Sequence, residues 1–279
     1  MNSHTMTVDD IEMRWEETGA GDPVILVHGI PTSPALWRDV VPHIKNRRVL
    51  AWEMPGYGAS IPQGKDRDIS ISAQADYLVA WMRSQGMTKA VLAGHDLGGG
   101  VVQIAAVRHP EMVSGILLTN AISYDSWPVP LIKGVAMAGS ILKCAPDGSL
   151  HQLLKLIYSQ GHETDKAAQA AFDTHSIHYD QHEGAADFVR QAKSLDVQDT
   201  KSIADDLPNL NMPARLVWGA ADDFQKIEYA ERLAKDLKAP LRRIEGGKHF
   251  TPEDHPELIA DEINKLVEMV EAEQNIQAS

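Results

Sequence analysis

A short stretch of glycine, histidine and aspartate, Gly94–Gly98, has the pattern of a catalytic turn between a strand and a helix. The apolar run Ala90–Ala93 precedes this stretch, and the helix-like run Val101–Ala106 follows it. In the G-x-S-x-G pattern, small flanking residues allow a sharp, strained turn that presents the central side chain at the strand end. Here the central residue is Asp96. The sequence therefore predicts a carboxylate nucleophile where that pattern carries a serine hydroxyl.

A carboxylate nucleophile favours a different reaction from a serine nucleophile. Its attack on an ester would give an anhydride, which is a poor intermediate. Its attack on a saturated carbon gives an ordinary ester, which water can then hydrolyse. Asp96 therefore favours the opening of an epoxide or the displacement of a halide over esterase or peptidase chemistry.

Alternating strand and helix patterns surround this turn, and they predict an α/β fold with a mostly parallel, doubly wound sheet. Continuous apolar runs are typical of strands that are buried on both faces. Residues 1–122 and 208–279 are predicted to form this core, and the helical patterns of residues 123–207 predict an inserted cap. Strands are predicted over Glu12–Glu17, Val24–Val27, Arg48–Trp52, Ala90–Ala93, Ser114–Asn120, Ala214–Trp218 and Pro240–Ile244, and helices over Ala35–Ile44, Ile71–Ser84, Glu228–Leu237 and Leu258–Val270.

An acid and a histidine also follow predicted strands. Asp222 and Asp223 come after the strand Ala214–Trp218, and His249 comes after a glycine pair in the next strand-to-helix connection. The carboxyl ends of parallel strands meet at one edge of a sheet, so these side chains are expected near Asp96. The chain order of nucleophile, acid and histidine is the order found with this type of turn.

With these residues in place, the chain resembles the α/β-hydrolases of the aspartate-nucleophile branch, which contains epoxide hydrolases and haloalkane dehalogenases. The matching segments span nearly the whole chain outside the predicted cap. They are His28–Pro31, Trp37–Arg38, Pro55–Ser60, Gly94–Gly99, Trp218–Asp222 and the loop of His249.

The resemblance implies a role for each matching residue. Asp96 would be the nucleophile, and His249 would be the base that activates water against the alkyl-enzyme ester. Asp222 would orient His249, and it is preferred to Asp223 because the family usually places its acid three residues after the glycine of W-G. The backbone N–H groups of Ile30 and Leu97 would form the oxyanion hole.

The residues that would recognise the electrophile are less clear from the sequence. Haloalkane dehalogenases usually place a tryptophan directly after the nucleophile, where this chain has Leu97, although the Trp127 indole could supply one donor. Haloacetate dehalogenases place arginines just after the nucleophile, and these are absent here. Epoxide hydrolases use cap tyrosines as acids. The predicted substrate-binding side chains are His28, Tyr124, Trp127, Tyr158 and Tyr179, with His151 and His162 as alternative donors. His28 is expected to brace the oxyanion loop rather than to titrate in catalysis.

Composition and net charge limit the classes of molecule that this chain is expected to bind. The net charge of −13 argues against nucleic acid and anionic membrane surfaces and leaves a small, largely apolar organic molecule as the expected substrate. Cys144 is the only cysteine, and no signal segment is visible, which favours the cytoplasm. No cofactor is expected. The spacing of His175, His178 and His182 fits no recognised zinc pattern, so no metal is expected either. A homo-oligomer remains open.

The first interpretation is an enzyme that hydrolyses epoxides to diols through a covalent ester on Asp96. The alternative within the same branch is hydrolytic dehalogenation. Ester or lactone hydrolysis is a remoter alternative. A non-catalytic ligand receptor on the same fold is the interpretation from a different class, and it would not need an intact set of Asp96, His249 and Asp222.

Overall fold

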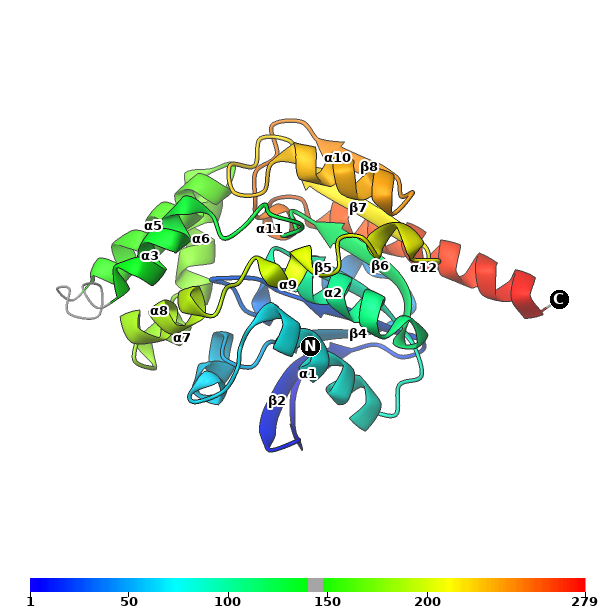
Figure 1. Ribbon diagram of the computed structural model, residues 1–279, viewed down its shortest axis with the longest axis horizontal. Helices are drawn as coiled ribbons and strands as arrows, with labels where there is room; N and C mark the ends of the chain where they lie inside the picture. Colours follow the sequence, from blue (N-terminus) through cyan, green and yellow to red (C-terminus); the bar gives the residue numbers. More distant parts are fainter. Residues whose placement is uncertain (140–147, 279) are drawn as a thin grey trace.

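An eight-stranded sheet forms the centre of the molecule in a computed structural model that describes residues 1–139 and 148–278 (Figure 1). The strand order is β1-β2-β4-β3-β5-β6-β7-β8, in which β2 pairs antiparallel with β1 and β4, and all other neighbours are parallel. The predicted α/β fold with a mostly parallel sheet is confirmed. The strands are β1 (Asn2–Val8), β2 (Ile11–Thr18), β3 (Pro23–Val27), β4 (Arg48–Glu53), β5 (Ala90–His95), β6 (Val113–Thr119), β7 (Ala214–Gly219) and β8 (Leu241–Ile244).

Helices cover both faces of the parallel part of the sheet, which explains why its strands are apolar on both sides. Helices α1 (Ile71–Ser84) and α2 (Leu97–Arg108) pack against each other on one face. Helix α12 (Pro256–Ala278) packs on β6 and β7 from the other face, and α10 (Ile227–Asp236) contacts β7 and β8. The carboxyl ends of β3, β5, β6 and β7 are thereby held at one edge.

One predicted helix needs correction, and one strand was not predicted. The predicted helix Ala35–Ile44 consists of two short 3-10 turns, Pro34–Trp37 and Val41–His43. Pro42 lacks an N–H group and restricts the residue before it, so a regular helix cannot run through this segment. Strand β1 was not predicted, because nearly all of its residues are exposed and show no apolar alternation.

The segment between β6 and β7 is helical, in the region where an inserted cap is predicted. Most of its helices gather on one side of the molecule in Figure 1, in green to yellow-green. Cys144 lies outside the described residues. None of the helices in the described part of the chain is long and apolar enough to cross a membrane. The helices of this segment are α3 (Pro130–Met137), α5 (Ser149–Gly161), α6 (Asp165–His175), α7 (Ile177–Asp180), α8 (Ala185–Lys193) and α9 (Gln198–Lys201).

Candidate active site

Asp96 lies in the sharp turn between β5 and α2, with φ 50° and ψ −119°. In this turn the main chain passes very close to itself and to the end of β3. A Cβ atom on Gly94 would overlap the backbone of Gly98, and a Cβ atom on Gly98 would overlap the carbonyls at the end of β3. These glycines therefore allow the strained position of Asp96, whose residue is 6% exposed at the carboxyl edge of the sheet.

The Asp96 carboxylate receives backbone hydrogen bonds where the sequence predicts an oxyanion hole. The Ile30 N–H donates to Asp96 Oδ2 at 3.0 Å, and the Leu97 N–H also interacts with the carboxylate. Burial raises the pKa of Asp96, while His249 and these two N–H groups oppose the rise. The two N–H groups would face the tetrahedral centre that forms when water attacks an ester on Asp96.

His249 lies between two carboxylates. Its Nδ1–H donates to Asp222 Oδ2 at 2.8 Å, and its Nε2 lies 3.9 Å from Asp96 Oδ1. Burial alone would lower the pKa of His249, but Asp222 and Asp96 raise it above its ordinary value. With Nδ1 protonated toward Asp222, Nε2 of the neutral ring is the nitrogen that can accept a proton from water beside Asp96.

The structure distinguishes the two neighbouring acids. Asp222 is 2% exposed and accepts the hydrogen bond from His249. The side chain of Asp223 is 78% exposed and pairs with Lys226. Asp222 therefore occupies the position that orients the imidazole, while Asp223 lies at the surface.

Asn120 also holds Asp222 in place, a role that was not predicted from the sequence. Its Nδ2–H donates to Asp222 Oδ2 at 2.7 Å, while its Oδ1 accepts from the Gly219 N–H at 3.2 Å and the Thr251 hydroxyl at 3.0 Å. Asn120 directly follows β6, with φ 44°. Its position at a strand end was a usable signal, but asparagine is also an ordinary turn residue.

His95, the residue before the nucleophile, holds the main chain of His249. Its Nε2–H donates to the His249 carbonyl at 2.9 Å, and the two rings lie 4.7 Å apart. Burial lowers the pKa of His95 well below its ordinary value, so the ring is neutral. His95 therefore acts as a positioning residue in this structure.

His28 does not line the cavity and instead braces the loop that carries Ile30. Its Nδ1–H donates to the Gly29 carbonyl at 2.9 Å, and its Nε2 accepts from the Met54 N–H at 3.2 Å. Burial lowers the pKa of His28 to about 3. The ring is therefore neutral with both nitrogens in use, which fits the expectation that His28 braces the oxyanion loop and corrects its place among the substrate-binding residues.

The predicted tyrosine acids lie outside the cavity beside Asp96. The Tyr124 hydroxyl donates to Asp236 at 2.7 Å, and the Tyr179 hydroxyl donates to Gln191 Oε1 at 2.8 Å. The Tyr158 hydroxyl donates to a backbone carbonyl at 3.1 Å, and burial raises its pKa well above the ordinary value. Each hydroxyl is engaged by a protein acceptor, so these placements correct the expectation that the tyrosines bind substrate.

Trp127 does line the cavity, but its N–H group is already in use. The indole Nε1–H donates to Thr200 Oγ1 at 2.6 Å. The alternative donor His151 bonds to Asp180 at the surface, also at 2.6 Å. Neither residue presents a free donor to Asp96.

The cavity beside Asp96 has a volume of about 50 Å³, and apolar side chains make up most of its wall. The titratable residues among those that line it are Asp96 and His249, and the lining contains no lysine or arginine. Such a wall suits an uncharged, apolar substrate. The lining residues are Ile30, Pro31, Asp96, Leu97, Ile122, Trp127, Pro128, Val129, Leu131, Ile132, Ile157, Leu195, Phe224, Gln225, His249 and Phe250.

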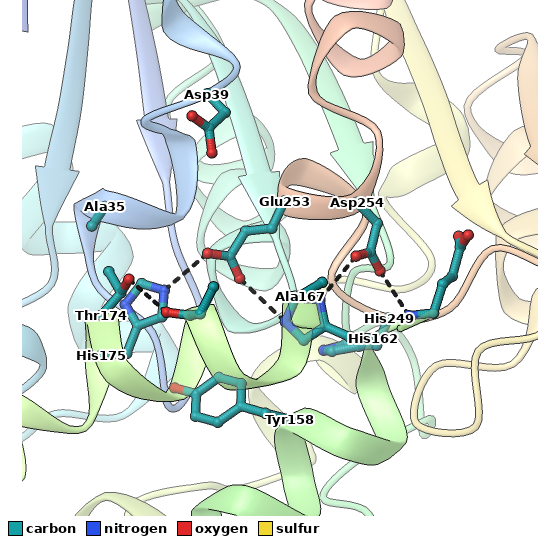
Figure 2. Close-up of polar contacts among 12 residues, drawn as sticks. Ala35, Asp39, Tyr158, His162, Ala167, Thr174, His175, His249, Glu253 and Asp254 are labelled. Atoms are coloured by element: carbon teal, nitrogen blue, oxygen red, sulfur yellow. Dashed lines mark hydrogen bonds and ion pairs between the residues drawn. The ribbon is translucent and has the colours of Figure 1, made fainter. Parts of the chain in front are cut away.

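A buried group of histidines and carboxylates joins the helical segment to the short helix α11 (Thr251–Asp254) that follows His249. Figure 2 shows Glu253 between the rings of His175 and His162, with Asp254 beside His162. Glu253 Oε1 lies 3.4 Å from His175 Nε2, and Glu253 Oε2 lies 3.4 Å from His162 Nε2. Asp254 Oδ1 lies 3.0 Å from His162 Nδ1. Nearby, the His249 N–H donates to the carbonyl of Gly161, the last residue of α5, at 2.9 Å. The alternative donor His162 is therefore part of the contact between the helical segment and the residues that follow His249. In the described part of the chain, no three or more His, Cys, Asp or Glu side chains, these four included, are arranged so that they could hold one metal ion.

Residues 24–262 match the Alpha/beta hydrolase family. The chain belongs to this family. This alpha/beta hydrolase is 24% identical to the uncharacterized hydrolase YugF of Bacillus subtilis (strain 168) over 271 residues, which cover 94% of this chain and 96% of that protein. It is also 33% identical to the bifunctional epoxide hydrolase 2 of Sus scrofa over 112 residues, but these cover 39% of this chain and 20% of that protein.

A crystal structure of an alpha/beta hydrolase fold protein from Burkholderia ambifaria has a TM-score of 0.83 with this hydrolase. The two are 23% identical, and the match covers 94% of this chain and 97% of that one. At this identity the likeness shows the fold.

Proposed function

We propose that this hydrolase uses Asp96 as a nucleophile on saturated carbon and hydrolyses epoxides to diols. One observation carries the proposal: a buried carboxylate occupies the strand-to-helix turn, and an imidazole that is oriented by a second carboxylate lies 3.9 Å from it. The partial similarity to the epoxide hydrolase of Sus scrofa supports the epoxide as the electrophile.

In the first step, the Asp96 carboxylate attacks one ring carbon, and the C–O bond of the epoxide breaks. The bonding electron pair moves to the oxygen, which takes a proton from water. The product is an ester between Asp96 and the substrate.

In the second step, His249 Nε2 takes a proton from water, which attacks Cγ of Asp96. Asp222 stabilises the resulting imidazolium, and the N–H groups of Ile30 and Leu97 stabilise the tetrahedral oxyanion. Collapse of this centre breaks the ester C–O bond, and the departing oxygen takes the hydroxyl proton of the tetrahedral centre, which releases the diol and regenerates the carboxylate with one oxygen atom from water. The His249 imidazolium returns its proton to the hydroxide that the first step left in the solvent.

Intact mass spectrometry of the His249→Gln variant tests the proposal, because loss of the base blocks the second step and traps the ester. An epoxide adds its whole mass to the protein, and a digest locates the addition on Asp96. An alkyl halide adds its mass less hydrogen halide, and that result alone would indicate a dehalogenase. Turnover of esters by the wild type without any adduct would remove the proposed chemistry.

The matched control is Asp96→Asn in the same His249→Gln background, which should acquire no mass. If wild type and variants convert none of the compounds, the result favours a ligand receptor on this fold. Single turnover in heavy-oxygen water gives a second check, because the label should enter Asp96 before it enters the diol.

A further inference from the structure

The main chain of His249 is held from both sides by residues outside its own loop. Its N–H donates to the carbonyl of Gly161, the last residue of α5, at 2.9 Å, and the Phe250 N–H donates to the same carbonyl at 3.1 Å. The His249 carbonyl accepts from the Nε2–H of His95 at 2.9 Å. A misplacement of about 1 Å in an active site can lower a rate about 100-fold, so the residues that hold this main chain matter for the reaction at Asp96.

The end of α5 also packs closely on the aromatic rings beside the His249 imidazole. A Cβ atom on Gly161 would overlap the Phe250 ring and would lie 3.2 Å from the Phe224 ring. The His249 ring lies edge-on to both of these phenyl rings, with ring centres 4.9 Å from Phe250 and 5.1 Å from Phe224. A shift of the end of α5 would therefore displace His249 through these rings as well as through the main chain.

Two side chains attach the end of α5 to α11, the helix that directly follows the base (Figure 2). The His162 Nδ1–H donates to Asp254 Oδ1 at 3.0 Å, and the Glu163 N–H donates to Asp254 Oδ2 at 3.2 Å. The His162 ring also stacks on the Phe250 ring, with ring centres 4.7 Å apart. The Asp254 carboxylate thus binds both of the residues that directly follow Gly161.

Packing alone does not require a polar pair at this place. The side chains of His162 and Asp254 are 0% and 6% exposed, and apolar residues of similar volume would avoid the cost of desolvating them. A hydrogen bond between a ring nitrogen and a carboxylate fixes both distance and direction, which an apolar contact does not. The orientation that the pair imposes on the end of α5 therefore explains it better than added stability does.

We infer that His162 and Asp254 are positioning residues for His249, because they hold the end of α5 whose last carbonyl binds its main chain. This inference rests on the proposed use of Asp96 as a nucleophile. In that reaction His249 acts as a base only after the ester has formed. Loss of a positioning residue should therefore slow hydrolysis of the ester and leave its formation unchanged.

The test measures the two steps separately with 1,2-epoxybutane, in rapid-quench experiments that follow the ester by intact mass spectrometry. Asp254→Asn keeps the shape and one acceptor oxygen, but it removes the charge and one of the two hydrogen bonds. We expect it to slow disappearance of the ester about 10- to 100-fold and to leave its appearance within about threefold of wild type. Once hydrolysis limits turnover, kcat and KM should fall together while kcat/KM, which reports ester formation, stays constant.

A double variant, His162→Leu with Asp254→Val, tests whether apolar packing is sufficient. Replacing a buried pair with apolar side chains usually preserves stability, so the double variant should melt near wild type and still hydrolyse the ester slowly. If it does not fold, Asp254→Asn alone decides. The matched control is His151→Gln, which breaks a 2.6 Å contact with Asp180 on the same helix and should leave both steps at the wild-type rate. Unchanged hydrolysis in Asp254→Asn, or equal slowing of both steps, would overturn the inference.

Amide hydrogen exchange separates this inference from the proposed reaction, because it requires no substrate. In Asp254→Asn, the amides of His249 and Phe250 should exchange about tenfold faster than in wild type, while the amides of β5 keep their protection. If the wild type forms no ester with any epoxide, the proposed reaction fails, and faster exchange at His249 would still support the role of Asp254. Unchanged exchange at His249 would refute that role.

Discussion

The Glu253 carboxylate is expected to contribute strongly to the attachment of the helical segment to the sheet. Its side chain is 4% exposed and accepts from Arg38 at 2.5 Å, besides its contacts with His162 and His175. Glu253→Gln keeps the shape and removes the charge. Breaking a buried ion pair costs about 3–5 kcal/mol. We expect the lower end, about 3 kcal/mol, because Arg38 is 36% exposed and is partly screened by water.

This free energy corresponds to a measurable change in melting temperature. An unfolding entropy of about 2.1 cal/mol/K per residue means that 1 kcal/mol shifts the melting temperature of this chain by about 1.7 °C. Glu253→Gln should therefore melt about 5 °C below wild type when thermal unfolding is followed by circular dichroism near pH 5.5. The control is Glu163→Gln, which breaks a more exposed contact with His255 and should shift the melting temperature by less than about 2 °C.

The pH dependence of this difference tests the electrostatic explanation. Burial by itself would lower the pKa of His162, but Asp254 and Glu253 raise it above its ordinary value. Burial by itself would raise the pKa of Glu253, but His162 and His175 lower it below its ordinary value. The stability from His162 is complete below its unfolded pKa of about 6.5 and is lost as the pH rises through the raised value. The stability from Glu253 is complete above its unfolded pKa of about 4.3 and is lost as the pH falls toward the lowered value.

The difference between wild type and Glu253→Gln should therefore be largest between about pH 4.5 and 6.5 and should shrink toward pH 9. Equal melting temperatures near pH 5.5 would refute the reasoning. A difference that grows toward pH 9 would refute the contribution of the histidines.

Three further substitutions test the geometry around the proposed nucleophile. A methyl group at Gly29 would overlap the Asp96 carboxylate, so Gly29→Ala should lower kcat about 100-fold while circular dichroism stays unchanged, and unchanged kcat would contradict this packing. Asn120→Ala removes a donor to Asp222 and should slow decay of the trapped ester about tenfold in a single-turnover assay, whereas an effect on ester formation alone would argue against it. Asp222→Asn should lower the pKa of His249, so the acid limb of the pH–kcat profile should move to lower pH, with a reduced plateau; a limb that moves upward would show that Asp222 does not raise this pKa.

The strand-to-helix turn, and most of the strands and helices around it, were predictable from the sequence because their signals are local. Apolar runs such as Val24–Val27 belong to strands that helices cover on both faces, and the helix Ile71–Ser84 was predicted with the bounds that the structure shows. The glycines that flank Asp96 point to a close approach of backbones, whatever their neighbours are. Local rules also explain one error, because Pro42 divides an apolar pattern that otherwise looks helical.

The residue types at the strand ends determined the kind of chemistry that this hydrolase can be expected to perform. A carboxylate in the turn, with an acid and a histidine after later strands, is a property of the sequence itself. Only the tertiary structure decided which side chains face one another. It placed Asp222 rather than Asp223 against His249, brought Asn120 to Asp222, and turned the tyrosine hydroxyls toward protein acceptors. It also left the Oε1 atom of Gln225, a residue that lines the cavity, without a hydrogen-bond partner, because the direction of a side chain depends on contacts between segments that are distant in the sequence.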